Sequence, residues 1–137
     1  MNADPRRSLR LQGIWLAAAL IVQYALGMYV NLFVQFPAQA TDAQRWEFAW
    51  SQAPLAAHIV LAILILLGAI AALVRAFVSG ERRWVPAYGA GFLAVLVAGA
   101  CGALFVSTQA DAYSYAMSLA FLIAMGAYLW GYFISHD

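Results

Sequence analysis

The sequence predicts an all-α integral membrane protein, folded as an up-down-up-down four-helix bundle with both termini in the cytoplasm. Of its 137 residues, 66% are hydrophobic and 9% are charged, whereas a soluble domain has about 45–50% apolar and about 25% charged residues. Four apolar stretches each reach the roughly 20 residues that cross a bilayer as a helix. They lack the alternation with a period of two that a membrane strand needs, so the backbone hydrogen bonds must be satisfied within helices.

This composition excludes a soluble enzyme and a disordered tail. The formal net charge is +1, so there is no basic field to hold nucleic acid. Cys101 is the single cysteine, which excludes a disulfide framework and a site built from several thiolates. We therefore expect one four-pass transmembrane domain over residues 1–137, in contact with the lipid bilayer and with no nucleic-acid partner.

The first predicted span covers residues 11–36 and is closed by Pro37. Arginines precede this span, as they precede a cleaved signal peptide. The apolar stretch is too long for a signal peptide, however, and Asn31, Gln35 and Pro37 do not form a cleavage site of small residues. We expect the first span to be a retained helix.

The connection that follows, residues 37–53, is the long one and is predicted to form an outer loop. Thr41 or Asp42 can cap a helical turn there, and Phe48 and Trp50 are suited to the lipid headgroup layer. Two interpretations stay open. The segment is either an interfacial helix that fixes the depth of the first two spans, or a lid over a pocket.

The other three spans are predicted at residues 54–78, 84–108 and 112–134. Pro54 suits the first turn of the second span, and Pro86 lies close enough to the start of the third span to leave that helix unkinked. The connections between these spans are short, which makes consecutive helices antiparallel neighbours.

The arginines predict the orientation, because cytoplasmic loops carry an excess of Lys and Arg. Six of the seven arginines lie at the amino terminus or between the second and third spans, and only Arg45 lies on the other side. We therefore expect a multi-pass protein of the cell (inner) membrane, with segment 37–53 on the outer face. Aromatic residues near the ends of the spans are predicted to anchor them at the interfaces: Trp46, Trp50, Trp84, Tyr88, Tyr113, Tyr115, Trp130 and Tyr132.

Polar residues within spans are costly and ask for a partner in protein, cofactor or water. Gln23, Gly27 and Asn31 recur at every fourth residue, which predicts a shared face pointing inward. His58 lies near the outer end of the second span, and Met117 and Tyr113 are expected at a similar depth in the last span. We predict that these six residues line a ligand pocket in the outer half, while the inner half is nearly all aliphatic and small.

Each of these residues also has a plainer interpretation. His58 can simply bond a backbone carbonyl, Gln23 and Asn31 can clasp neighbouring helices, and Met117 can be ordinary packing. It is their expected convergence at one depth that favours a pocket.

Residues 23–27 (QYALG) and 54–62 (PLAAHIVLA) resemble one four-helix half of the heme A synthase family. The resemblance covers chiefly the first two spans. It implies that His58 is an axial ligand of a haem b on the outer side. That family supplies a second histidine from its fourth helix, and here Met117 is the obvious substitute, because His/Met ligation is acceptable to haem iron. The family's carboxylate just before the histidine has no close counterpart, since Glu47 lies well upstream.

Three functions therefore compete. The first is a cytochrome-like electron-transfer protein holding haem b through His58 and Met117, and the second is a non-catalytic accessory or structural subunit of a larger membrane complex or homo-oligomer. The third is a binder of a quinone or another apolar small molecule. Catalytic residues are not predicted, because the sequence has no phosphate-binding glycine loop and no paired carboxylates within a span.

Overall fold

The computed structural model describes residues 5–134, and its elements in that range are all helical. Four of the helices are long and apolar enough to cross a membrane, as the sequence predicts. The elements in chain order are α1 (Pro5–Phe33), α2 (Asp42–Ser51), α3 (Ala53–Val78), the short 3-10 helix η1 (Arg82–Trp84), α4 (Val85–Thr108) and α5 (Asp111–Phe133).

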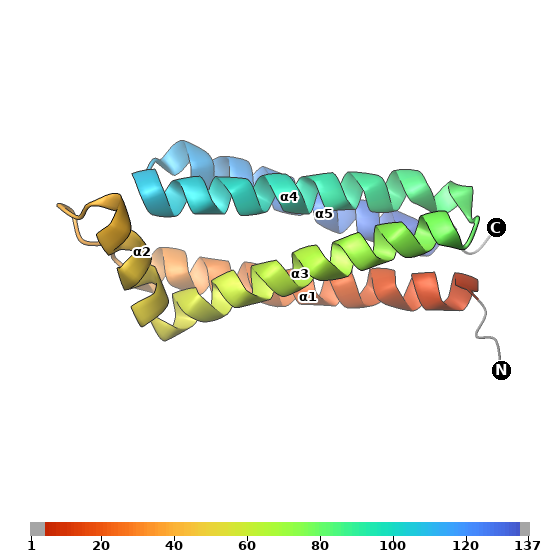
Figure 1. Ribbon diagram of the computed structural model, residues 1–137, viewed down its shortest axis with the longest axis horizontal. Helices are drawn as coiled ribbons and strands as arrows, with labels where there is room; N and C mark the ends of the chain where they lie inside the picture. Colours follow the sequence, from red (N-terminus) through yellow and green to blue (C-terminus); the bar gives the residue numbers. More distant parts are fainter. Residues whose placement is uncertain (1–4, 135–137) are drawn as a thin grey trace.

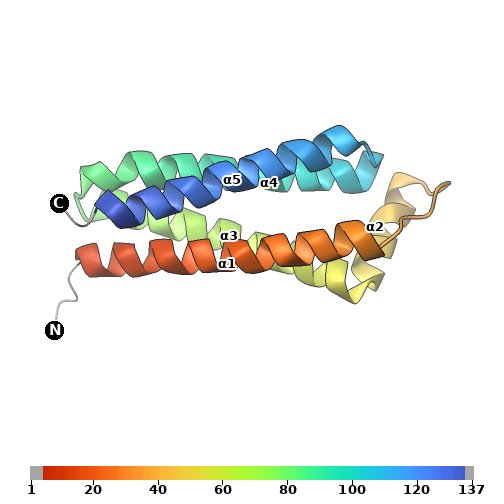
Figure 2. The ribbon, with the colours of Figure 1, turned by 180° about the vertical axis from the view of Figure 1, so that it is seen from behind.

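The four long helices lie along the long axis of the molecule, and each runs in the opposite direction to the one before it in the chain (Figures 1 and 2). The closely packed pairs are α1 with α3, α3 with α4, α4 with α5, and α5 with α1. Hence α1 lies diagonally opposite α4, and α3 lies diagonally opposite α5. Both described termini and the connection from α3 to α4 lie at one end, here named the terminal end, whereas α2 lies at the other, named the α2 end.

Helix α1 differs from its predicted bounds at both ends. It begins at Pro5 rather than at residue 11, because a helix does not stop where the apolar stretch stops and proline suits a first helical turn. It ends at Phe33 rather than at residue 36. Its last backbone bond runs from the Val34 N–H to the Val30 carbonyl, and the residue before Pro37 is biased away from helical angles.

The connection over residues 37–53 contains α2, so it is partly helical, as the interpretation of an interfacial helix expects. Thr41 is the N-cap, and Gln44 completes a capping box in which each residue bonds the other's backbone N–H. This confirms the cap expected from the sequence. Ala49 of α2 is fully buried in a small cluster with Val30, Leu55 and Val106, so α2 packs on the ends of the long helices.

The main core reaches the terminal end, where its largest fully buried side chains are aromatic. Trp84, Tyr88 and Tyr128 are each 0% exposed. The prediction that Trp84 and Tyr88 are interfacial anchors is therefore wrong, and so is that of an aliphatic inner half. The Tyr88 hydroxyl donates to the Leu9 carbonyl at 2.7 Å and so joins α4 to α1.

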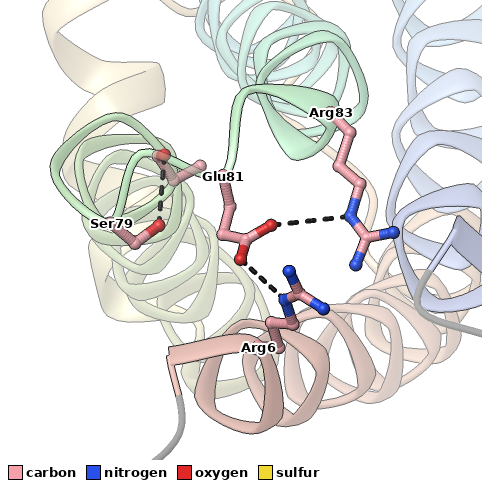
Figure 3. A network of polar contacts seen from close by, with 5 residues as sticks. Arg6, Ser79, Glu81 and Arg83 are labelled. Atoms are coloured by element: carbon pink, nitrogen blue, oxygen red, sulfur yellow. Dashed lines mark hydrogen bonds and ion pairs between the residues drawn. The ribbon is translucent and has the colours of Figure 1, made fainter.

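An ionic network also ties α1 to the connection between α3 and α4 (Figure 3). The Arg6 Nε lies 2.7 Å from one carboxylate oxygen of Glu81, and the Arg83 Nε lies 3.5 Å from the other. The Glu81 side chain is only 17% exposed, so both arginines converge on a partly buried carboxylate. The terminal end is thereby fixed by charge as well as by packing.

Candidate functional site

His58 lies in the second turn of α3, just after Pro54, and its ring faces α1. A Cβ atom added to Gly27 of α1 would lie 3.0 Å from the imidazole Cε1. Such a distance is tighter than ordinary contact between these atoms. Gly27 therefore provides the room that lets the histidine ring lie between the two helices.

Gln23, one turn before Gly27, bonds His58 twice. Its side-chain nitrogen lies 3.1 Å from the imidazole Nε2 and 3.1 Å from the His58 backbone oxygen. A carbonyl oxygen can only accept, so the amide nitrogen donates to it, and the same NH₂ group then donates to Nε2. The geometry therefore requires the tautomer with its proton on Nδ1.

This pairing leaves one donor and one acceptor unused. The His58 Nδ1 and the Gln23 Oε1 are both buried, and neither has a hydrogen-bond partner within residues 5–134. Buried polar atoms are normally paired, because an unpaired one costs about 1–3 kcal/mol. The structure therefore leaves one buried donor and one buried acceptor between α1 and α3 without a hydrogen-bond partner in this range.

Asn31 does not join this cluster, because its side chain is exposed. The prediction of a shared inward face holds for Gln23 and Gly27 and is wrong for Asn31. Residues four apart are separated by about 40° around a helix, so two such steps turn the face by about 80°. Asn31 therefore lies about 80° around α1 from Gln23, and its side chain no longer faces α3.

Met117 lies on α5, diagonally opposite α3. Its sulfur packs against α4, where a Cβ atom added to Gly102 would lie 3.4 Å from it. His58 instead points at α1, so the two side chains expected to converge lie against different helices. Tyr113 is half-buried in the first turn of α5, and its backbone N–H donates to the Ala110 carbonyl at 3.0 Å.

Sequence reasoning missed the contacts that hold α2 in place. The Trp46 Nε1 donates to the Ser107 hydroxyl at 3.2 Å, and the Arg45 guanidinium donates to the Ser107 backbone carbonyl. The adjacent Arg and Trp in a predicted outer loop were the available signal. Both α3 and α4 contact α2, which therefore covers the α2 end of the bundle (Figure 1).

The hollows on the described surface include two at the terminal end, and His58 lines neither of them. The first hollow is lined by Phe77, Gly80, Arg82, Val85 and Pro86, and the second by Ala71, Val74, Arg75, Val78 and Ser79.

No group of three or more His, Cys, Asp or Glu side chains within residues 5–134 is placed to hold a metal ion.

Comparison of the chain with protein-family models, with curated proteins and with solved structures finds no match. The resemblance to the heme A synthase family therefore stays an expectation from the sequence.

Proposed function

We propose that this chain is a four-pass protein of the cell's inner membrane that binds a lipophilic ligand with a polar head group between α1 and α3. The observation that carries the proposal is the pair of unpartnered atoms, the His58 Nδ1 and the Gln23 Oε1. A membrane interior supplies no water to satisfy them, so a ligand that does so gains binding free energy.

The distribution of arginine supports a cytoplasmic location for both termini. The terminal end carries six arginines, and the α2 end carries only Arg45. With that orientation His58 and Gln23 lie in the outer half of the membrane, beneath α2.

A quinone is the ligand class that this donor and acceptor fit best. Its oxidised form presents carbonyl oxygens that accept from the His58 Nδ1–H. Its reduced form presents hydroxyls that donate to the Gln23 Oε1. An isoprenoid tail is soluble in the surrounding lipid, so the site needs to enclose only the head group.

Haem b is the ligand that the sequence resemblance implies, with His58 and Met117 as the iron ligands. The residues as arranged do not fit it. The imidazole Nε2 is bonded to Gln23, the ring abuts Gly27, and the Met117 sulfur packs against α4. We therefore rank a quinone above haem b.

Purification in mild detergent, followed by solvent extraction and an absorption spectrum, tests the proposal. We expect quinone in the extract and no Soret band. His58→Ala and Gln23→Leu should lose at least most of the quinone, whereas Met117→Leu should retain it. A Soret band lost in both His58→Ala and Met117→Leu would establish haem instead. Quinone content unchanged in His58→Ala, or no ligand in the native protein, would refute the site.

A second candidate function is that of an accessory subunit in a larger membrane complex or homo-oligomer. It is favoured by glycines that face open space, because small residues let helices of two chains approach closely. Cβ atoms added to Gly89, Gly99 and Gly126 would meet nothing within 4 Å. A stoichiometric partner in a detergent pull-down, lost when Gly99→Leu is introduced, would support this function.

A further inference from the structure

The connection between α3 and α4 borders an apolar hollow of about 470 Å³ on the surface of the terminal end. Sites for small ligands occupy roughly 300–1,000 Å³, so the hollow is large enough for part of a lipid. Gly80 lines it in the left-handed conformation, with φ at +71°, and no atom would lie within 4 Å of a Cβ there. The turn at Gly80 therefore borders the hollow and places no side chain in it.

Arg82 is the charged residue of this hollow. Its guanidinium is exposed and forms no hydrogen bond or ion pair with another residue of the described range 5–134. Its neighbours differ. Arg6 and Arg83 share Glu81 (Figure 3), and the Arg75 guanidinium donates to the Ser8 hydroxyl. Glu81 is thus already engaged by two arginines, which leaves the charge of Arg82 available to an external anion.

The surroundings of Arg82 also favour an anion with an apolar tail. Val85 and Pro86 are the first residues of α4, so the positive end of its helix dipole lies at the same place. Phe77 and Val85 supply an apolar wall, and Phe77 is 63% exposed. Both parts of the site lie where an apolar span meets a basic loop, which is the level of lipid phosphates.

We propose that the hollow at Arg82 binds an anionic phospholipid of the cytoplasmic leaflet, with the phosphate on the guanidinium and an acyl chain along Phe77 and Val85. A free phosphate would use the charge and leave the apolar wall unused. This lipid site is separate from the ligand site at His58, so either can fail without the other.

Native mass spectrometry of the full chain in mild detergent tests the proposal. We expect phosphatidylglycerol to bind in preference to phosphatidylcholine with the same acyl chains. Arg82→Gln should weaken phosphatidylglycerol binding about fivefold, which corresponds to the roughly 1 kcal/mol that one basic residue contributes near an anionic membrane. Arg7→Gln is the matched control, because Arg7 is exposed at the same end and does not line the hollow.

Three outcomes would overturn the site. They are equal binding of the two lipids, equal loss in Arg82→Gln and Arg7→Gln, and displacement of the lipid by inorganic phosphate alone. Phe77→Ala is a second test variant. It should weaken the binding of phosphatidylglycerol and leave any binding of inorganic phosphate unchanged. An unchanged affinity for phosphatidylglycerol in this variant would also contradict the proposal.

Discussion

Glycines set which aromatic side chains can enter the interior of this bundle. A Cβ atom added to Gly91 would lie 2.6 Å from Cζ of Tyr128, and one added to Gly13 would lie 2.9 Å from the Tyr88 hydroxyl. The two tyrosine rings pack with their centroids 5.8 Å apart. The buried aromatic cluster therefore depends on the absence of side chains on the helices opposite.

We predict that Gly91→Ala destabilises the protein, whereas Gly99→Ala does not. Overpacking costs about 1–3 kcal/mol, which exceeds the roughly 0.5–1 kcal/mol that alanine gains over glycine within a helix. Gly99 faces open space, so only the gain applies there. The free energy of unfolding of each variant, measured in detergent, tests the prediction. Equal effects of Gly91→Ala and Gly99→Ala would contradict the packing described.

Tyr88→Phe is predicted to lower the free energy of unfolding by about 1 kcal/mol, because it removes the hydrogen bond to the Leu9 carbonyl. Tyr115→Phe is the matched control, since Tyr115 is 68% exposed. Equilibrium unfolding of the two variants under the same conditions makes the comparison. A loss of the same size in Tyr115→Phe would show that the Tyr88 bond contributes nothing specific.

Among the elements, α2 is the one whose position depends most on polar contacts. It is ten residues long, and isolated helices shorter than about 12–15 residues are marginal in water. Its capping box and the hydrogen bonds from Arg45 and Trp46 to Ser107 provide the stability that so short a helix lacks by itself. Through these contacts α2 packs on the ends of α3 and α4.

Thr41→Ala should fray the start of α2, because it removes the hydroxyl that accepts from the Gln44 N–H. The loss of such a cap costs about 0.5–2 kcal/mol. Hydrogen exchange of the α2 amides should rise about 2- to 30-fold by that measure, while the exchange of α4 is unchanged. Thr41→Ser keeps the hydroxyl and should exchange as the native protein does. If Thr41→Ser exchanges as fast as Thr41→Ala, the capping box does not stabilise α2.

The molecule as a whole is asymmetric along its long axis. Figures 1 and 2 show the chain ends at one end and α2 at the other. Six of the seven arginines and the buried aromatic side chains belong to the terminal end, and the pair of His58 and Gln23 lies toward the α2 end. Both described termini lie at the arginine-rich end. An even number of spans with one basic end predicts a single orientation in the membrane.

Labelling with a membrane-impermeant maleimide tests this orientation in intact cells. In a Cys101→Ala background, Gln39→Cys should be labelled from outside, because residue 39 is exposed in the connection that leads to α2. Arg82→Cys should be labelled only after the cells are opened. The reverse pattern would place both termini outside and would move the proposed lipid site to the outer leaflet.

Hydrophobic runs and charge are enough to predict the four helices of this protein, because lipid forces a backbone to satisfy its own hydrogen bonds. The helix cap at Thr41 could also be predicted, because it follows from local spacing. The sequence placed His58 and Met117 at one depth, but it could not show that they lie against different helices. Similar depth along two helices does not specify their order around the bundle.

Composition therefore determines the class of this protein and its four candidate spans, and the placement of arginine predicts their orientation. Only the tertiary structure decided that α3 and α5 are diagonal, that Asn31 turns outward, and that Trp84 and Tyr88 are buried rather than interfacial. The physical reason is that nearly every face of these helices is apolar, so hydrophobicity does not distinguish the face that packs from the face that meets lipid. The positions of the glycines that leave space for large aromatic rings decide which helix faces pack against one another.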